Sequence, residues 1–132
     1  MSKKIIGIGS LLTVTFILTM LGCSKTTTVL VDSSPTVTGT ISFSKDIQPV
    51  LSKTCAISGC HSGTIAPNLS SGSAYNTLIS GKYINTGSAE TSEVYLWLTG
   101  KRSMAMPSGT PNNPSNINAL ILAWVKQGAK NN

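Results

Sequence analysis

The feature that most constrains this chain is residues 55–61, a segment with the sequence Cys-Ala-Ile-Ser-Gly-Cys-His. It holds two of the three cysteines and the only histidine. Two thiols can form thioether bonds to the vinyl groups of a haem, and a histidine directly after the second thiol can then ligate the iron. Such motifs usually have two residues between the cysteines, whereas this one has four, and Gly59 can adopt the positive φ that the longer loop requires. We therefore interpret Cys55, Cys60 and His61 as an attachment site for one covalent haem c.

Two other interpretations of these residues stay open. In an oxidising compartment Cys55 and Cys60 could form a local disulfide, with His61 as an ordinary surface residue. A structural zinc ion would need about four Cys or His ligands, and the chain beyond its first 23 residues offers only these three.

The beginning of the chain is typical of an export signal. Two lysines precede residues 5–21, an apolar run that is short for a membrane span and is followed by Gly22 and Cys23. This ending resembles the lipobox of bacterial lipoproteins, in which the cysteine receives lipid and becomes the new amino terminus. We expect residues 1–22 to be a lipoprotein signal peptide, with a plain signal peptide or an uncleaved anchor as the alternative. The mature chain would then be lipid-anchored in the bacterial cell envelope, at a periplasmic or outer-membrane face.

The remaining sequence divides into a tether and one domain. Residues 23–40 are rich in Thr, Ser and Val without helical periodicity, which predicts a flexible tether. Residues 41–132 then form a single small domain, and at this size a bound haem would add apolar surface to a limited core. With lipid on Cys23, the odd cysteine count leaves Cys55 and Cys60 as a pair.

The spacing of apolar residues predicts four short helices and no strand, so the fold class is all-α with long loops. The first helix follows residues 43–46, contains Pro49 in its first turn and ends at Cys55. The second covers about residues 73–80 and stops at Gly81, and the third covers about residues 91–99. The last helix begins with a Ser115 cap and stops at Gly128. Its predicted core stripe consists of Ile117, Leu120, Ile121, Trp124 and Val125.

The loop between the last two predicted helices carries Met104 and Met106, the only methionines beyond the signal segment. Since His61 is the only histidine, a second protein ligand to the iron would come from this pair, or one iron position stays open. Pro107 restricts the backbone of Met106, which favours Met106 over Met104 as that ligand. The alternative is that both methionines only pack in the core.

Residues 43–129 resemble a class I cytochrome c domain, closest to the small haem-binding domains of Planctomycetes and Bacteroidetes that accept the longer cysteine spacing. The matching pieces occur in order, at residues 46–51, 55–61, 66–69, 106–107 and 124–129. The resemblance implies a cytochrome c-like fold in which the backbone carbonyl of Pro67 accepts from the outer nitrogen of His61. It also implies that Met106 is the distal iron ligand.

These expectations favour one-electron transfer over enzymatic chemistry. An iron held by His61 and Met106 has no open position and a raised potential. The chain has four acidic side chains and one histidine, and no base and nucleophile pair is evident. We expect a membrane-tethered monohaem electron carrier that is not an enzyme. The alternatives are a haem-based sensor or accessory subunit of a haem oxidoreductase, and a haem-free, disulfide-bonded lipoprotein binding module.

The formal net charge of +6 bears on the partners. The lysines are scattered, no aromatic residues alternate with them, and the export signal separates the chain from nucleic acid, so we expect no nucleic-acid partner. The expected partners are redox proteins with acidic surfaces, and the membrane through lipid on Cys23. An ordinary solvated surface is the alternative explanation of the charge.

Overall fold

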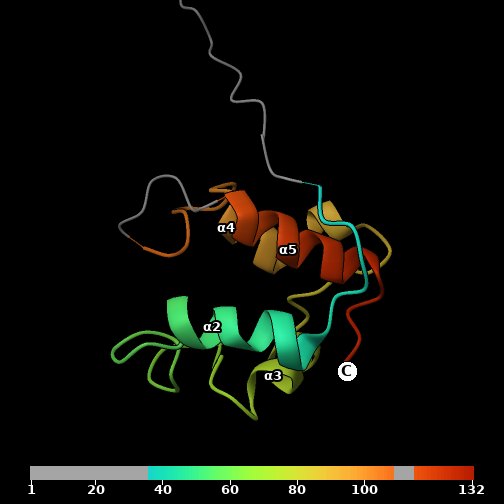
Figure 1. Ribbon diagram of the computed structural model, residues 1–132. Coiled ribbons are helices and arrows are strands. Elements are labelled where there is room, and N and C mark those ends of the chain that lie inside the picture. Colours follow the sequence, from blue (N-terminus) through green and yellow to red (C-terminus); the bar gives the residue numbers. More distant parts are fainter. Residues whose placement is uncertain (1–35, 109–114) are drawn as a thin grey trace, which may run out of the picture. The chain divides into compact units, whose positions relative to one another are not determined.

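The computed structural model describes residues 36–108 and 115–132 of the chain. Helices are the only regular secondary structure in these residues, which confirms the all-α prediction for them (Figure 1). The elements in chain order are η1 (Phe43–Ile47), α2 (Gln48–Thr54), α3 (Ala74–Ser80), η2 (Ala89–Thr91), α4 (Glu93–Leu98) and α5 (Ser115–Lys126). None of the helices in this part of the chain is long and apolar enough to cross a membrane. The predicted signal peptide, Cys23 and residues 23–35 of the predicted tether lie outside the described residues.

The first helical segment starts earlier than the sequence predicts, because η1 adds a wide turn before α2. The Ser42 hydroxyl accepts a hydrogen bond from the Lys45 amide at 3.2 Å, and the Asp46 carboxylate accepts one from the Ser42 amide at 2.8 Å. These reciprocal bonds satisfy amide groups that the first turn leaves unpaired. Pro49 lies in the first turn of α2, where its missing N–H is no loss, as predicted. The helix ends at Thr54, and Cys55 is its C-cap.

The second predicted helix agrees closely with α3, which follows Ser73 and ends at Gly81. The stop depends on close packing more than on a left-handed backbone, since the φ of Gly81 is −77°. A side chain at this position would collide with the ring of Tyr83 and would lie 2.8 Å from the carbonyl oxygen of Thr77. Glycine is therefore required here for space.

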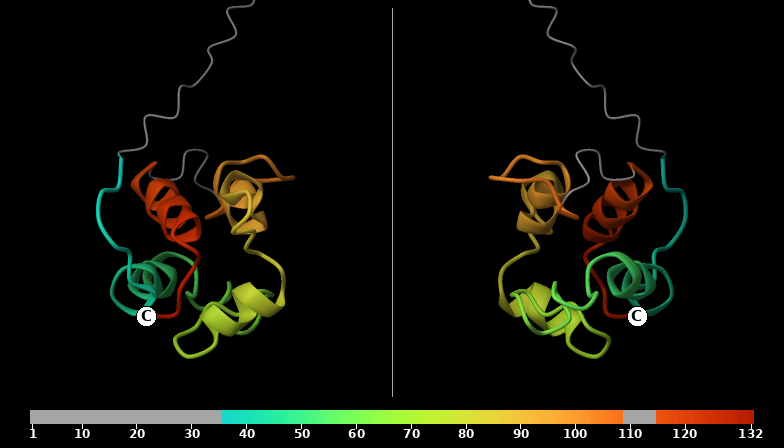
Figure 2. Two further views of the ribbon diagram at one scale, coloured as in Figure 1. Left: turned by 90° about the vertical axis from the view of Figure 1, so that its right-hand side faces the viewer. Right: turned by 90° about the vertical axis from the view of Figure 1, so that its left-hand side faces the viewer.

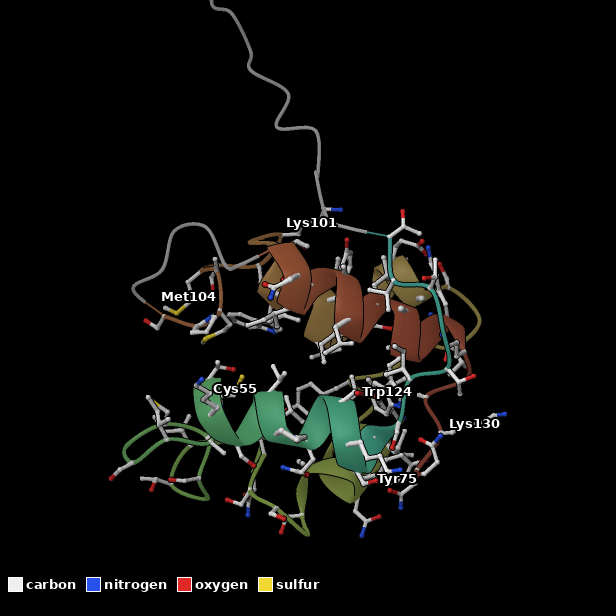
Figure 3. The ribbon with its side chains drawn as sticks, in the orientation of Figure 1. Cys55, Tyr75, Lys101, Met104, Trp124 and Lys130 are labelled. Atoms are coloured by element: carbon white, nitrogen blue, oxygen red, sulfur yellow. The ribbon has the colours of Figure 1, made fainter. Side chains whose placement is uncertain are left out.

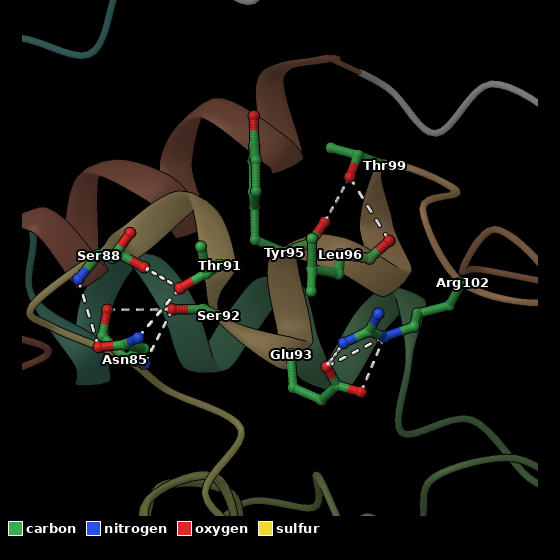
Figure 4. Close-up of polar contacts among 9 residues, drawn as sticks. All are labelled: Asn85, Ser88, Thr91, Ser92, Glu93, Tyr95, Leu96, Thr99 and Arg102. Atoms are coloured by element: carbon green, nitrogen blue, oxygen red, sulfur yellow. Dashed lines mark hydrogen bonds and ion pairs between the residues drawn. The ribbon is translucent and has the colours of Figure 1, made fainter.

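The third predicted helix, residues 91–99, is interrupted in the structure. The short turn η2 and the six-residue α4 are separated by Ser92, whose side chain is completely buried. The Ser92 hydroxyl accepts a hydrogen bond from the Asn85 amide at 2.9 Å and lies 3.3 Å from the Asn85 carbonyl oxygen, to which it donates (Figure 4). These side-chain-to-backbone bonds compete with helical hydrogen bonding and end the turn.

The core is centred on three aromatic rings from distant parts of the chain. The ring of Phe43 lies 5.2 Å from that of Tyr75 and 5.3 Å from that of Trp124, between centroids. The Trp124 indole donates to the Lys130 carbonyl at 3.0 Å, and the Tyr75 hydroxyl donates to the Ala129 carbonyl at 3.2 Å. Each polar ring atom is thus satisfied while the ring stays packed.

The predicted apolar stripe of α5 faces this core. Three of its members, Ile121, Trp124 and Val125, are buried, and the other two, Ile117 and Leu120, pack against the core while partly exposed. This confirms the helical periodicity read from the sequence.

The helices form two layers. α2 and α3 lie in one layer and α4 and α5 in the other, as Figure 1 and both views of Figure 2 agree. The Cys–His segment follows α2, and the methionine loop follows α4. The two candidate parts of the site therefore come from opposite layers.

Candidate functional site

The Cys–His segment forms a compact loop after α2. The amide of Cys60 donates to the carbonyl of Ile57 at 3.0 Å, and the amide of His61 donates to the carbonyl of Cys55 at 3.2 Å. Gly59 has a φ of +79°, which confirms the positive φ predicted for it. The four-residue spacing is thus absorbed by a hydrogen-bonded turn that keeps His61 next to Cys55.

Both cysteines are half-buried free thiols, and no disulfide joins them. Burial raises the pKa of the Cys55 thiol above its ordinary value, and the nearby Cys60 raises it further, while a hydrogen bond with Thr54 acts in the opposite direction. The Thr54 hydroxyl oxygen lies 3.3 Å from the Cys55 sulfur. Cys55 is therefore a free thiol that gives up its proton less readily than an ordinary cysteine.

The orientation of His61 identifies its tautomer. Its Nδ1 atom lies 3.3 Å from the carbonyl oxygen of Ile65. A carbonyl can only accept a hydrogen bond, so Nδ1 carries a hydrogen in this contact, and in the neutral ring the lone pair is then on Nε2. Nε2 has no hydrogen-bond partner within residues 36–108 and 115–132. His61 thus offers Nε2 as a ligand atom.

Pro67 lies half-buried in the loop that follows His61. The carbonyl at Nδ1 of His61 is that of Ile65, two residues before Pro67. The amide of Leu69 donates to the carbonyl of His61 at 2.8 Å and closes the loop around this proline. The role that the resemblance implies for the Pro67 carbonyl in the haem-bound protein stays a prediction.

The methionine loop, residues 101–108, belongs to the layer opposite that of the Cys–His segment. Figure 3 shows Met104 and Cys55 at the same end of the domain. Met104 is 50% exposed, whereas Met106 is half-buried and its amide donates to the Trp97 carbonyl at 3.0 Å. Both candidate methionines lie on this loop, and Met104 lies at the end of the domain that carries Cys55.

The acidic side chains in the described part of the chain are all engaged. Asp46 accepts from the Ser42 amide, Glu90 pairs with Lys126 at 2.6 Å, and Glu93 pairs with Arg102. Five lysines there have no acidic partner within 4 Å among the described residues: Lys45, Lys53, Lys82, Lys101 and Lys130. The described surface therefore keeps an excess of unpaired positive charge.

The donor set fits a covalently bound haem. It comprises two free thiols, one imidazole with an available Nε2, and two thioethers on the loop after α4. For a metal ion held only by His, Cys, Asp or Glu, the described residues contain no suitable group of three or more.

Three residues that the sequence does not single out hold the methionine loop in place. These are Glu93, Trp97 and Arg102, all within or just beyond α4. The only sequence signal for the ion pair is an acidic and a basic residue on either side of Gly100. No protein-family model, curated protein or solved structure matches the chain.

Proposed function

We propose that this protein is a membrane-tethered monohaem c-type cytochrome that carries single electrons between redox partners in the bacterial cell envelope. In this proposal residues 41–132 have a cytochrome c-like fold, with short helices and long loops around one covalent haem c. The observation that carries the proposal is the contact from His61 Nδ1 to the Ile65 carbonyl, 3.3 Å away, beside two reduced thiols. It leaves Nε2 available in the position directly after Cys60.

Cys55 and Cys60 would hold the haem through thioether bonds. Each thiol adds across one vinyl group, so that a carbon–sulfur bond forms and the thiol hydrogen passes to the neighbouring vinyl carbon. This addition needs no oxidant, but it needs both thiols reduced, which agrees with their free state.

His61 and Met106 would hold the haem iron. The haem, when bound, supplies a one-electron iron couple. Two protein ligands leave no position for a substrate, and the thioether favours a raised reduction potential. Electron transfer is therefore favoured over sensing or oxygen chemistry, and we propose no enzymatic activity.

The excess positive charge supports a partner with an acidic surface. Five lysines without an ion pair in the described residues would attract such a partner at low ionic strength, and salt would weaken that attraction. The lipid on Cys23 would keep the domain near the membrane in which the partner works, within reach of the tether.

The first experiment is a visible spectrum of the purified protein, produced with a cytochrome c maturation system. We expect a low-spin spectrum with a methionine-to-iron charge-transfer band, and haem that stays with the protein in acid–acetone. Replacing both Cys55 and Cys60 by Ser should make the haem extractable. A high-spin spectrum would favour the haem-based sensor. If the wild-type protein shows no Soret band, it carries no haem, and the haem-free binding module would be the remaining interpretation.

A second experiment tests the membrane anchor. Cys23→Ser should leave the spectrum unchanged and move the protein from the detergent phase to the aqueous phase. Cys60→Ser is the matched control, since it should alter haem attachment and leave the partitioning unchanged. Detergent partitioning that survives Cys23→Ser would contradict the lipoprotein assignment.

A further inference from the structure

An ion pair fastens the start of the methionine loop to the start of α4. The Arg102 Nε atom lies 2.9 Å from Oε1 and 3.1 Å from Oε2 of Glu93, and Nη2 also contacts Oε2 (Figure 4). This arrangement uses both carboxylate oxygens and fixes the direction of the arginine side chain. Because Glu93 is the first residue of α4, Arg102 must reach back along the helix that the chain has just left.

Two backbone bonds fasten the same loop to the other end of α4. The amide of Lys101 donates to the Leu96 carbonyl at 2.9 Å, and the amide of Met106 donates to the Trp97 carbonyl at 3.0 Å. The chain reverses at Gly100, which has a φ of +68°. The segment between Arg102 and Met106 is therefore held at both of its ends.

We propose that Arg102 and Glu93 are positioning residues that set the strength of methionine ligation. The ion pair acts through the loop and does not touch the haem in this role. It restricts the conformations of the four residues that follow Arg102, so less conformational entropy is lost when a methionine sulfur binds the iron. The inference rests on the proposed function and holds for Met104 as well as for Met106, since both lie on this loop.

The chain offers a matched control for the ion pair. Lys126 at the end of α5 pairs with Glu90 in η2, at 2.6 Å. The side chains of this second pair are 53% and 52% exposed, against 39% and 35% for Arg102 and Glu93. Both pairs are thus partly solvated, but only the first includes a residue of the methionine loop.

The test is a titration of the haem-loaded protein with imidazole, which competes with methionine for the iron. If a substitution weakens the binding of methionine to the iron by some factor, the apparent affinity for imidazole rises by the same factor. We expect Arg102→Gln and Glu93→Gln each to raise the apparent imidazole affinity roughly two- to fivefold. This factor corresponds to the free energy that a partly exposed ion pair contributes. The imidazole affinity of the double variant should be no higher than that of either single variant, because each single substitution already removes the same interaction. The imidazole affinity of Arg102→Lys should lie between the affinities of Arg102→Gln and the wild type. The affinities of Lys126→Gln and Glu90→Gln should equal that of the wild type.

A second measurement does not depend on the iron. Hydrogen exchange at the Met106 amide should be faster in Arg102→Gln and Glu93→Gln than in the wild type and the two control variants, because the bond to Trp97 opens more often. Equal imidazole affinity in all variants would overturn the inference, as would an equal rise in the loop variants and the controls. A wild type without haem, or with imidazole affinity unchanged by Met104→Ala and Met106→Ala, would instead overturn the proposed function itself, and this inference with it.

Discussion

The Nδ1 atom of His61 lies 3.3 Å from the carbonyl oxygen of Ile65, four residues further along the chain. The Ile65 amide donates in turn to the Cys60 carbonyl at 3.1 Å, so residues 60–65 form a closed turn. In this turn the Ile65 carbonyl favours the tautomer that has its hydrogen on Nδ1. The proposed iron ligation through Nε2 would therefore need no change of tautomer.

The tautomer can be measured directly. In haem-free protein at a pH where the ring is neutral, we expect the nitrogen NMR shifts of His61 to report a hydrogen on Nδ1. The same measurement in urea, where the turn is lost, is the control and should show mainly the Nε2–H form that free imidazole side chains prefer. A folded protein with its hydrogen on Nε2 would contradict the geometry of the His61 site.

The two methionines should respond differently to truncation. We expect Met106→Ala to abolish the methionine-to-iron charge-transfer band, lower the reduction potential and open the iron to added ligands. Met104→Ala should leave the band in place, since this side chain is 50% exposed and Met106 is the more buried of the two. The comparison requires only visible spectra and a redox titration. The reverse pattern would make Met104 the ligand, and no effect of either change would exclude methionine ligation.

The raised pKa of the Cys55 thiol predicts how the stability of the haem-free protein depends on pH. Burial is the largest cause of the shift from the ordinary value of 9.0 and penalises the thiolate. The folded state therefore holds this proton more tightly than the unfolded state does. Its contribution to stability is complete below pH 9 and is lost as the pH rises from there through the raised pKa of the folded protein.

Urea unfolding under reducing conditions measures this effect. The free energy of unfolding of the wild type should fall between pH 8 and pH 10 by more than that of Cys55→Ser, which lacks the titrating thiol. Lysines and tyrosines titrate in both proteins, so their contribution cancels when the free energy of unfolding of Cys55→Ser is subtracted from that of the wild type. Parallel pH profiles would show that the Cys55 thiol is not desolvated in the folded protein.

The buried hydroxyl of Ser92 should contribute strongly to stability. It bonds both the amide and the carbonyl of Asn85, at 2.9 and 3.3 Å, and the Ser92 side chain itself is fully buried. Ser92→Ala is expected to destabilise the protein by about 1–3 kcal/mol, because both hydrogen bonds made by this buried hydroxyl are lost. Ser88→Ala, at an exposed position in the same turn, is the control and should change stability by less than about 0.5 kcal/mol. Chemical denaturation measures the free energy of unfolding of both variants. Equal losses of stability in Ser92→Ala and Ser88→Ala would contradict a special role of Ser92.

Several elements could be predicted from the sequence because they depend on local patterns. The positions of α3 and α5 follow from the spacing of their apolar residues, and the turn in the Cys–His segment follows from the freedom of Gly59. The grouping of the two cysteines with His61 needs no tertiary information, since these residues are neighbours in the chain.

Other features are decided by contacts that no periodic pattern in the sequence reports. The predicted third helix is broken because Ser92 bonds to Asn85, and no helical pattern reports that pairing. The carbonyl at Nδ1 of His61 is chosen by the way the loop closes, and the fastening of the methionine loop depends on Arg102 reaching back to Glu93. Residue types and spacings determine which atoms are able to act, because chemistry and local propensity are properties of short segments. Which of those atoms meet depends on how the chain reverses and packs, and only the tertiary structure decides this.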